Sequence, residues 1–144
     1  MKKSVIYSDG ASSGNPGEAG IGGVVNVDGK TFEFSRSIGV ATNNVAEYSA
    51  LIEALKKAIE MGATEVQVFL DSELVVRQIN GQYRVRHENI KPLYEKAISL
   101  LSSFKKFSVR HIPREQNRRA DALSKEGIRA SSRPPAGPYR QDLF

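Results

Sequence analysis

The chain opens with three short segments that predict strands. In the first, apolar and polar residues alternate, so Val5, Tyr7 and Asp9 would share one face. The second and third segments are separated by Asp28-Gly29, a dipeptide typical of a hairpin turn. The predicted strands cover residues 3–9, 21–27 and 30–37. Together they indicate an antiparallel meander at the start of the fold.

Apolar residues then recur at helical spacing. They predict a helix over 44–61, with Thr42 or Asn43 as its N-cap. A short β-branched run over 66–70 predicts a strand that ends at Asp71. The remaining pattern predicts a helix over 72–79, a helix over 88–104 with Pro92 in its first turn, a strand over 107–112 and a helix over 117–129.

This order of elements predicts an α/β fold. An antiparallel meander followed by helix–strand crossovers gives a five-stranded mixed sheet flanked by helices. We expect this domain to cover residues 1–129 and a Pro-rich C-terminal tail to cover 130–144, because the composition changes there. Tyr139, Leu143 and Phe144 of the tail could still dock on the body.

Composition excludes several protein classes. A length of 144 residues and a hydrophobic share of 40% fit one globular domain, and exclude a disordered or collagen-like chain. No apolar run approaches the ~18 residues that a membrane span needs, and no secretory signal is recognisable. The absence of cysteine excludes disulfides and thiolate chemistry. A cytoplasmic location with no membrane partner is consistent with these features. We also expect a monomer.

Positive charge is in excess and unevenly distributed. The chain has 21 Lys and Arg against 16 Asp and Glu, a formal net charge of +5. Residues 105–119 carry six basic side chains and one acid, and residues 77–91 carry four and one. Such clusters suit a polyanionic partner such as a nucleic acid. A basic face that meets only solvent is equally consistent with the charge pattern.

Four carboxylates occupy unusual positions. Asp9 and Asp71 are predicted at strand ends, where each alone could be a turn residue or a helix cap. Glu47 is predicted in the first turn of a helix, on the stripe that faces the sheet. An unpaired charge is costly there, although a first-turn acid also favours the helix dipole. Asp121 has an equivalent place in the last predicted helix.

Taken together, the four acids permit a metal site at one edge of the sheet. Ligands bind at strand carboxyl ends in open α/β sheets, and all four acids could reach that edge. Carboxylates without cysteine or paired histidines suit Mg²⁺ or Mn²⁺ rather than zinc. Two such ions about 3.5–4 Å apart can clamp both oxygens of an in-line displacement at phosphorus.

Each acid also lies in a distinctive segment of sequence. The segments are IYSDGASSGNPGEAGIGGVV around Asp9, TNNVAEYSALIEAL around Glu47, VFLDSELVVRQING around Asp71 and HIPREQNRRADALS around Asp121. In order and spacing, over residues 5–127, they closely resemble type 1 ribonuclease H. The resemblance implies a ribonuclease H-like fold and endonucleolytic cleavage of the RNA strand of RNA–DNA hybrids. It also implies two Mg²⁺ ions per active site, Mn²⁺ as a substitute, and products with 5′-phosphate and 3′-hydroxyl ends.

The same resemblance assigns catalytic roles. Asp9, Glu47, Asp71 and Asp121 match the family's four metal-binding acids. Asp9 would bridge the two ions, Asp71 and Glu47 would hold the ion facing the leaving oxygen, and Asp121 would help hold the ion that generates hydroxide. Arg114 is favoured over His111 for a loop position near the scissile phosphate, because His111 falls in the predicted strand. An arginine there could stabilise charge but could not act as a base.

The resemblance also implies a set of substrate contacts. They are Gly10, Ala11, Ser12, Asn15, Thr42, Asn43, Asn44 and Glu73. The backbone of the first three would approach the RNA minor groove, where 2′-hydroxyls distinguish RNA from DNA. Asn15 also suits a plain turn role. At Glu73 the best-known members have glutamine, so this side chain either turns away from phosphates or contacts a 2′-hydroxyl.

A second departure from the family pattern concerns hybrid affinity. Some members carry a long basic protrusion where this chain has only residues 81–87. Tyr83, Arg84 and Arg86 remain in that segment. Fewer phosphate contacts would weaken binding that depends on salt.

Three other functions are less consistent with the sequence. A non-catalytic nucleic-acid-binding module would lack one of the four acids, and all are present. Another nuclease or polynucleotidyl transferase of the superfamily would share the acids but not the Asp9 segment followed by Thr42-Asn43-Asn44. A sugar or nucleotide kinase would need a phosphate loop of the Gly-x-x-x-x-Gly-Lys-Ser/Thr type, which is absent.

Overall fold

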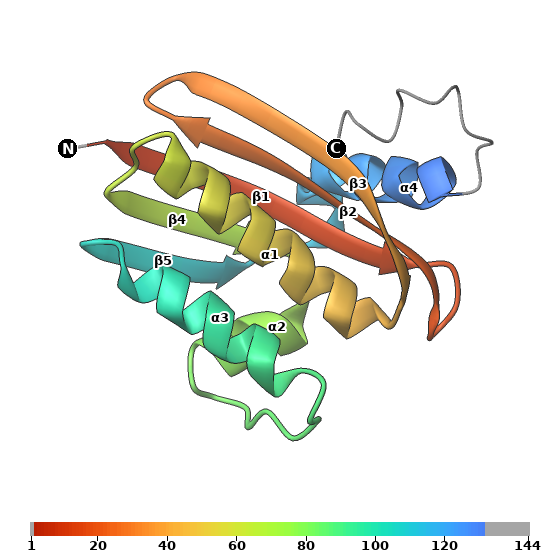
Figure 1. The fold of residues 1–144 in the computed structure, drawn as a ribbon. Helices are drawn as coiled ribbons and strands as arrows, with labels where there is room; N and C mark the ends of the chain where they lie inside the picture. The colour runs from red at the N-terminus through yellow and green to blue at the C-terminus, as the bar shows by residue number, and fades with distance from the viewer. Residues whose placement is uncertain (1, 132–144) are drawn as a thin grey trace.

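The strand β1 (Lys3–Ser12) lies at the centre of a five-stranded mixed sheet in the computed structural model, which describes residues 2–131 (Figure 1). The strand order is β3-β2-β1-β4-β5. The other strands are β2 (Gly17–Val27), β3 (Lys30–Ala41), β4 (Glu65–Leu70) and β5 (Lys106–His111). The pairs β1–β2 and β2–β3 are antiparallel, whereas β1–β4 and β4–β5 are parallel. The predicted mixed α/β sheet is therefore confirmed.

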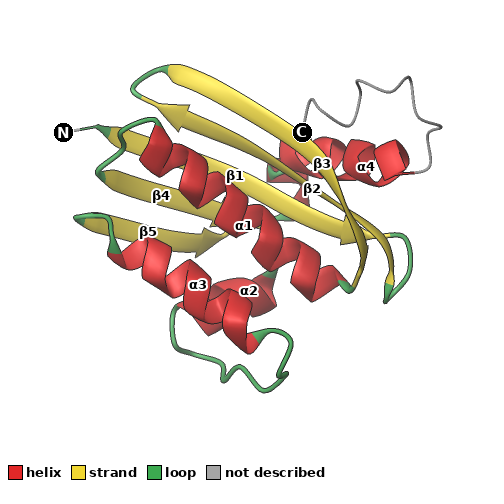
Figure 2. Cartoon of the chain, in the orientation of Figure 1, coloured by secondary structure: helices red, strands yellow, loops and turns green. Residues whose placement is uncertain are grey.

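The helices cover both faces of this sheet, as Figure 2 shows. They are α1 (Asn43–Glu60), α2 (Glu73–Ile79), α3 (Lys91–Ser102) and α4 (Arg118–Ser131), with a short 3-10 turn, η1 (Arg114–Gln116), before α4. On the α1 face, Ile6, Val25 and Leu51 are fully buried in the main hydrophobic core. No helix in the described part of the chain is long and apolar enough to cross a membrane.

Glycines allow α4 to lie very close to the opposite face. A Cβ atom at Gly20 or Gly22 of β2 would overlap the backbone of α4 around Ser124. A Cβ atom at Gly127 of α4 would overlap the backbone of Arg36 in β3. Glycine is thus required on both sides of this contact, because no larger residue leaves room for it. The close packing sets the position of the helix that carries Asp121.

The element boundaries depart from prediction mainly in the first three strands, and β3 continues past its predicted end at 37 to Ala41. β1 continues to Ser12 and β2 begins at Gly17, because Asp9, Gly10, Ala11 and Ser12 remain paired with β2. Glycine and other small residues there show no apolar–polar alternation. The alternation that predicts a strand therefore stops before the hydrogen bonding between the strands does. The remaining helices and strands lie within a few residues of their predicted bounds.

The predicted boundary between body and tail falls inside α4, which extends to Ser131. The docking suggested for Tyr139, Leu143 and Phe144 lies outside the described residues.

Candidate active site

Asp9 lies beyond the end of the β1–β4 pairing but still within the β1–β2 pairing. The parallel pairing of β1 with β4 ends at Tyr7–Phe69, whereas the antiparallel pairing of β1 with β2 continues through Asp9–Gly22. The expectation that Asp9 ends a strand was therefore wrong, since the extended hairpin carries it inside β1. The consequence is the same: its carboxylate is placed at the carboxyl end of the parallel strands.

Asp71 directly follows β4 at the same edge. The reading of Asp71 as a helix cap does not hold, because the side chain of Ser72 accepts the capping hydrogen bond from the Val75 N–H of α2. Asp71 is only partly buried and lines a cleft at that edge. The predicted convergence of strand ends therefore brings Asp71 next to Asp9.

Glu47 approaches from α1 and lies just beyond the first turn, where it was predicted. It is the fifth helical residue, and the first turn contains no acid. The backbone N–H of Gly10 donates to Glu47 Oε1 at 2.6 Å. A Cβ atom at position 10 would overlap the backbone of Ala46 and Glu47, so Gly10 is what allows this approach. Gly10 thus serves first to seat α1 and to orient Glu47.

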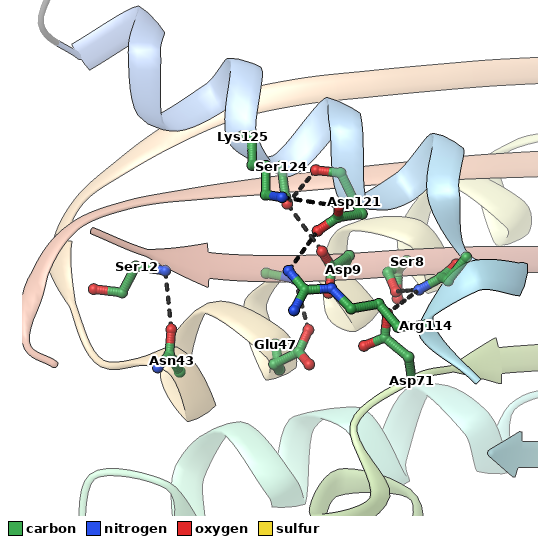
Figure 3. A network of polar contacts seen from close by, with 12 residues as sticks. Ser8, Asp9, Ser12, Asn43, Glu47, Asp71, Arg114, Asp121, Ser124 and Lys125 are labelled. Carbon is green, nitrogen blue, oxygen red and sulfur yellow. Dashed lines mark hydrogen bonds and ion pairs between the residues drawn. The ribbon is translucent and has the colours of Figure 1, made fainter. Parts of the chain in front are cut away.

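The three acids meet in one cluster. One carboxylate oxygen each from Asp9, Glu47 and Asp71 lies within 4.8 Å of the others. Figure 3 shows these side chains pointing towards one another, with Arg114 extending across them. They line an open cleft of about 310 Å³ together with Gly10, Ala11, Asn43, Arg114 and Asp121. A group of anionic oxygens this close repels itself unless protons or cations neutralise it.

Asp121 lies at the border of the cluster, in the first turn of α4 as predicted. Its carboxylate forms ion pairs with Arg114 at 3.4 Å and Lys125 at 3.1 Å. The hydroxyl of Ser124 lies 3.0 Å from Asp9 Oδ2 and 2.8 Å from the Asp121 carbonyl oxygen. Asp121 therefore shares the cleft with the other acids but is balanced by two cations.

The electrostatics separate Asp121 from the other acids. Burial, and then the charge of Asp71, raise the pKa of Asp9 to about 7. Burial and the charge of Asp9 raise the pKa of Glu47 well above its usual range. Burial also raises the pKa of Asp71, although a hydrogen bond from Asn117 opposes it. For Asp121, burial is outweighed by hydrogen bonds with Lys125 and Asp9 and by nearby cations, so its pKa is lowered.

This donor set fits a hard divalent cation. The oxygens of Asp9, Glu47 and Asp71 are carboxylate ligands, and the chain contains no cysteine that would favour a softer metal. Neighbouring negative charges help to raise the pKa of Asp9 and of Glu47, and a bound cation would neutralise those charges.

Several predicted substrate residues form a network at the start of α1. The Ser12 N–H donates to Asn43 Oδ1 at 3.0 Å, and the Asn43 N–H donates to Asn15 Oδ1 at 3.1 Å. Thr42 is the N-cap of α1, accepting from the Val45 N–H. Asn15 therefore links the bend at 13–16 to the first residue of α1, and its turn role stays a prediction. Substrate contact by these residues stays a prediction.

Asn44 lines a different, basic cleft. Its other lining residues are Leu74, Gln78, Gln82, Tyr83, Arg84, Arg86 and His87. Tyr83 is 47% exposed, and the guanidinium carbon of Arg77 lies 5.3 Å from its ring centre. Glu73 does not line the acidic cleft and instead pairs with Arg77 at 2.9 Å. Its charge is thus partly neutralised, and its substrate role stays a prediction.

The loop position before α4 is occupied by Arg114, in η1. His111 is the last residue of β5, as the predicted strand required, and does not line the acidic cleft. Arg114 therefore lines the cleft with the acids, whereas His111 lies outside its lining but close enough for its charge to lower the pKa of Asp71.

Sequence reasoning missed Asn117 and Ser124. Both are buried, and they contact Asp71 and Asp9 respectively. The polar residues inside the segment QNRRADALS were the available signal, because an amide and a hydroxyl at positions that α4 buries need partners.

The comparisons with known proteins agree with this geometry. A family model described as "Reverse transcriptase-like" matches residues 7–127. The "Bifunctional protein Rv2228c" of Mycobacterium tuberculosis is 44% identical over 137 residues, which cover 93% of this chain but only 38% of that protein. A "Ribonuclease H" of Chlorobium chlorochromatii is 37% identical over 152 residues, covering 92% of this chain and 100% of the relative.

Solved structures extend the likeness to three dimensions. The N-terminal RNase H domain of Rv2228c superposes with a TM-score of 0.88 at 42% identity, covering 92% of this chain and 97% of that chain. LC11-RNase H1, solved in complex with an RNA/DNA hybrid, superposes with a TM-score of 0.82 at 43% identity, covering 89% and 98%.

Proposed function

Because the chain belongs to the type 1 ribonuclease H family, we propose that it is an endonuclease that hydrolyses the RNA strand of RNA–DNA hybrids. The single observation that carries this proposal is the convergence of Asp9, Glu47 and Asp71 within 4.8 Å, with Asp121 in the same cleft. The hybrid bound by LC11-RNase H1 supports the choice of substrate. The proposal concerns this domain, since the chain spans 38% of the mycobacterial relative's length.

The proposed cofactor is a pair of Mg²⁺ ions, with Mn²⁺ as a substitute. Asp9, Glu47, Asp71 and Asp121 would hold them through carboxylate oxygens, with Asp9 shared. When bound, the ions would neutralise charge on the scissile phosphate and lower the pKa of the attacking water. The products would carry 5′-phosphate and 3′-hydroxyl ends.

The chain's own groups would position the substrate. Arg114, at the mouth of the acidic cleft, would donate its guanidinium N–H groups to a phosphate oxygen. Ala11 lines the same cleft, which suits a contact with the RNA strand close to the scissile bond. The other proposed contacts are Gly10, Ser12, Asn15, Thr42, Asn43, Asn44 and Glu73. We also propose that the protein acts as a monomer in the cytoplasm.

The decisive experiment is cleavage of a labelled RNA–DNA hybrid. The protein is assayed with Mg²⁺, Mn²⁺ or a chelator, beside single-stranded RNA, double-stranded RNA and DNA. Metal-dependent cutting of the hybrid's RNA strand, with the other substrates intact, is the expected result. Binding of the hybrid without cutting would overturn the proposal and leave a non-catalytic nucleic-acid-binding module.

A matched pair of variants locates the activity. Asp71→Asn should lower cleavage at least about 1,000-fold, roughly 4 kcal/mol of transition-state stabilisation, because it removes a metal ligand. Hybrid binding, measured in chelator, should stay close to that of the unmodified protein. Asp28→Asn makes the same change in the exposed β2–β3 turn and should cleave normally. Loss of folding in Asp71→Asn would instead assign Asp71 a structural role.

A further inference from the structure

Asn117 occupies a capping position but does not cap a helix. It directly precedes α4, and its backbone carbonyl accepts the first helical hydrogen bond from the Asp121 N–H at 3.0 Å. An asparagine there ordinarily turns its side-chain oxygen onto a helix N–H. Here the side chain is 1% exposed, and Oδ1 has no hydrogen-bond partner in the described part of the chain. The residue is therefore buried for some other reason than capping.

The amide group of Asn117 is used as a double donor. Nδ2 donates to the Ser8 carbonyl oxygen at 3.0 Å and lies 3.3 Å from Asp71 Oδ2. Both partners are acceptors, and the two hydrogens of one amide nitrogen suit them. Rotating the amide by half a turn would set Oδ1 against two oxygens. Ser8 and Asp71 thus determine the orientation of the amide. In this orientation the buried acceptor Oδ1 has no hydrogen-bond donor.

The place of these contacts explains what they accomplish. The β1–β4 ladder ends at Tyr7–Phe69, so the Ser8 carbonyl lies one residue beyond the last paired position of β1. Asn117 reaches that carbonyl from the start of α4. Ser8 immediately precedes Asp9, and Asp71 immediately follows β4. One amide therefore ties together the backbone beside Asp9 and the carboxylate of Asp71; Figure 3 shows Ser8 beside Asp9 and Asp71.

We propose that Asn117 is a positioning residue that holds the Asp71 carboxylate in its cation-binding orientation towards Asp9 and Glu47. This inference rests on the proposed function of the acidic cleft. Asn117 touches neither substrate nor ion in this role, and it acts through Asp71. Without the amide, the Asp71 side chain would rotate freely beside two repelling acids and spend less time in the orientation that binds a cation.

The test uses Mn²⁺ binding, read from the electron paramagnetic resonance signal of free Mn²⁺, alongside kcat and KM for the hybrid. In Asn117→Ala, Mn²⁺ affinity and kcat should each fall about 10- to 100-fold. KM for the hybrid should change less than about threefold. Asn80→Ala is the matched control, because Asn80 also donates to a strand carbonyl, Val109 O at 3.0 Å, but contacts no acid. It should leave both quantities unchanged.

A double-mutant cycle separates positioning from general structural support. In an Asp71→Asn background, removing Asn117 should weaken Mn²⁺ binding by no more than about twofold further, because its partner carboxylate is already gone. Where Asn117→Ala does not fold, Asn117→Ser takes its place in the cycle.

The outcomes distinguish this inference from the proposed function. Folded Asn117 variants that retain Mn²⁺ affinity and kcat overturn the positioning role, as does a full additive loss in the Asp71→Asn background. An unmodified protein that never cleaves hybrids overturns the proposed function instead, and the Mn²⁺ cycle still decides the role of Asn117.

Discussion

Each of the three converging acids is oriented by a group from another element. Ser124 of α4 contacts Asp9, the Gly10 N–H of β1 donates to Glu47, and Asn117 donates to Asp71. Because these donors are fixed by the fold, the carboxylates are oriented before any cation arrives. The unfavourable energy of placing these like charges close together is thus offset by the free energy of folding, and not by the binding of a ligand.

Gly10 offers a direct test of that arrangement. Gly10→Ala should lower the free energy of unfolding by about 3 kcal/mol, because the new methyl group would displace the backbone of α1 at Ala46. It should also reduce cleavage by moving Glu47. Urea denaturation and hybrid cleavage measure the two effects. Gly39→Ala is the control, since a Cβ there meets nothing within 4 Å and only the positive φ of 78° is strained. It should cost about 1 kcal/mol and leave activity intact.

Arg114 is tested by its effect on turnover. Arg114→Ala should lower kcat about 10- to 100-fold and change KM for the hybrid much less, because the proposed contact stabilises charge at the scissile phosphate. Steady-state kinetics on a labelled hybrid separates the two parameters. Arg110→Ala removes an exposed arginine of β5 outside the acidic cleft and should be close to neutral. A KM effect alone in Arg114→Ala would make Arg114 a binding residue.

Among the elements, the connection between α2 and α3 has the clearest link to substrate affinity. Arg84 and Arg86 line the basic cleft with Asn44 of α1 and are exposed. The double variant Arg84→Ala/Arg86→Ala should weaken hybrid binding and reduce the slope of log affinity against log salt by about 2. Lys30→Ala/Lys56→Ala removes the same charge from the start of β3 and from α1, and should leave the slope nearly unchanged. Equal losses in both variants would indicate a general charge effect.

The sequence predicted the elements well wherever apolar periodicity was strong. The stripe that includes Leu51 and Leu55 predicted α1 to within a residue at each end. The pattern failed along residues 10–12, 17–20 and 38–41, where β1, β2 and β3 are extended by pairing with one another rather than by apolar alternation. Local propensity contains no information about such pairing, because it depends on a partner elsewhere in the chain.

The site residues were also predictable only in part, because some of their roles depend on contacts with distant parts of the chain. Asp9, Glu47, Asp71 and Asp121 could be identified from their segments, and the fold gathers them around one cleft. Asn117 could not be assigned in this way. An asparagine before a helix predicts a cap, and only the three-dimensional neighbourhood of Ser8 and Asp71 shows that its amide is used otherwise.

At the scale of the whole molecule, the cluster of acids works against stability unless it is neutralised. The raised pKa values of Asp9 and Glu47 mean that the folded protein binds protons which the unfolded chain has already released. By linkage, the free energy of unfolding then falls as pH rises from the ordinary carboxyl range of about 4 towards 7. The pKa of Asp121 is lowered, so this residue changes the free energy of unfolding in the opposite direction. That change occurs below about pH 4, outside the range in which Asp9 and Glu47 act.

The metal-free protein should therefore melt at a lower temperature at pH 8 than at pH 5. Each group contributes up to about 1.4 kcal/mol per pH unit within the window. Mg²⁺ should raise the melting temperature more at pH 8 than at pH 5, because cations bind the ionised carboxylates. Calorimetry with Mg²⁺ or chelator measures both effects. Asp9→Asn should flatten the pH dependence, and an unchanged slope in that variant would contradict the assignment to this cluster.

The contribution of α4 to the site has a consequence for biosynthesis. Asp121, Asn117 and Ser124 all lie in residues 117–124, after every strand, and α4 is the last helix that the structure describes. A ribosome-bound chain that has released β1 to β5 but not α4 carries three of the acids without the groups that orient Asp9 and Asp71. We expect the proposed nuclease to be inactive at that stage and to become active once α4 has emerged and folded onto the glycines of β2.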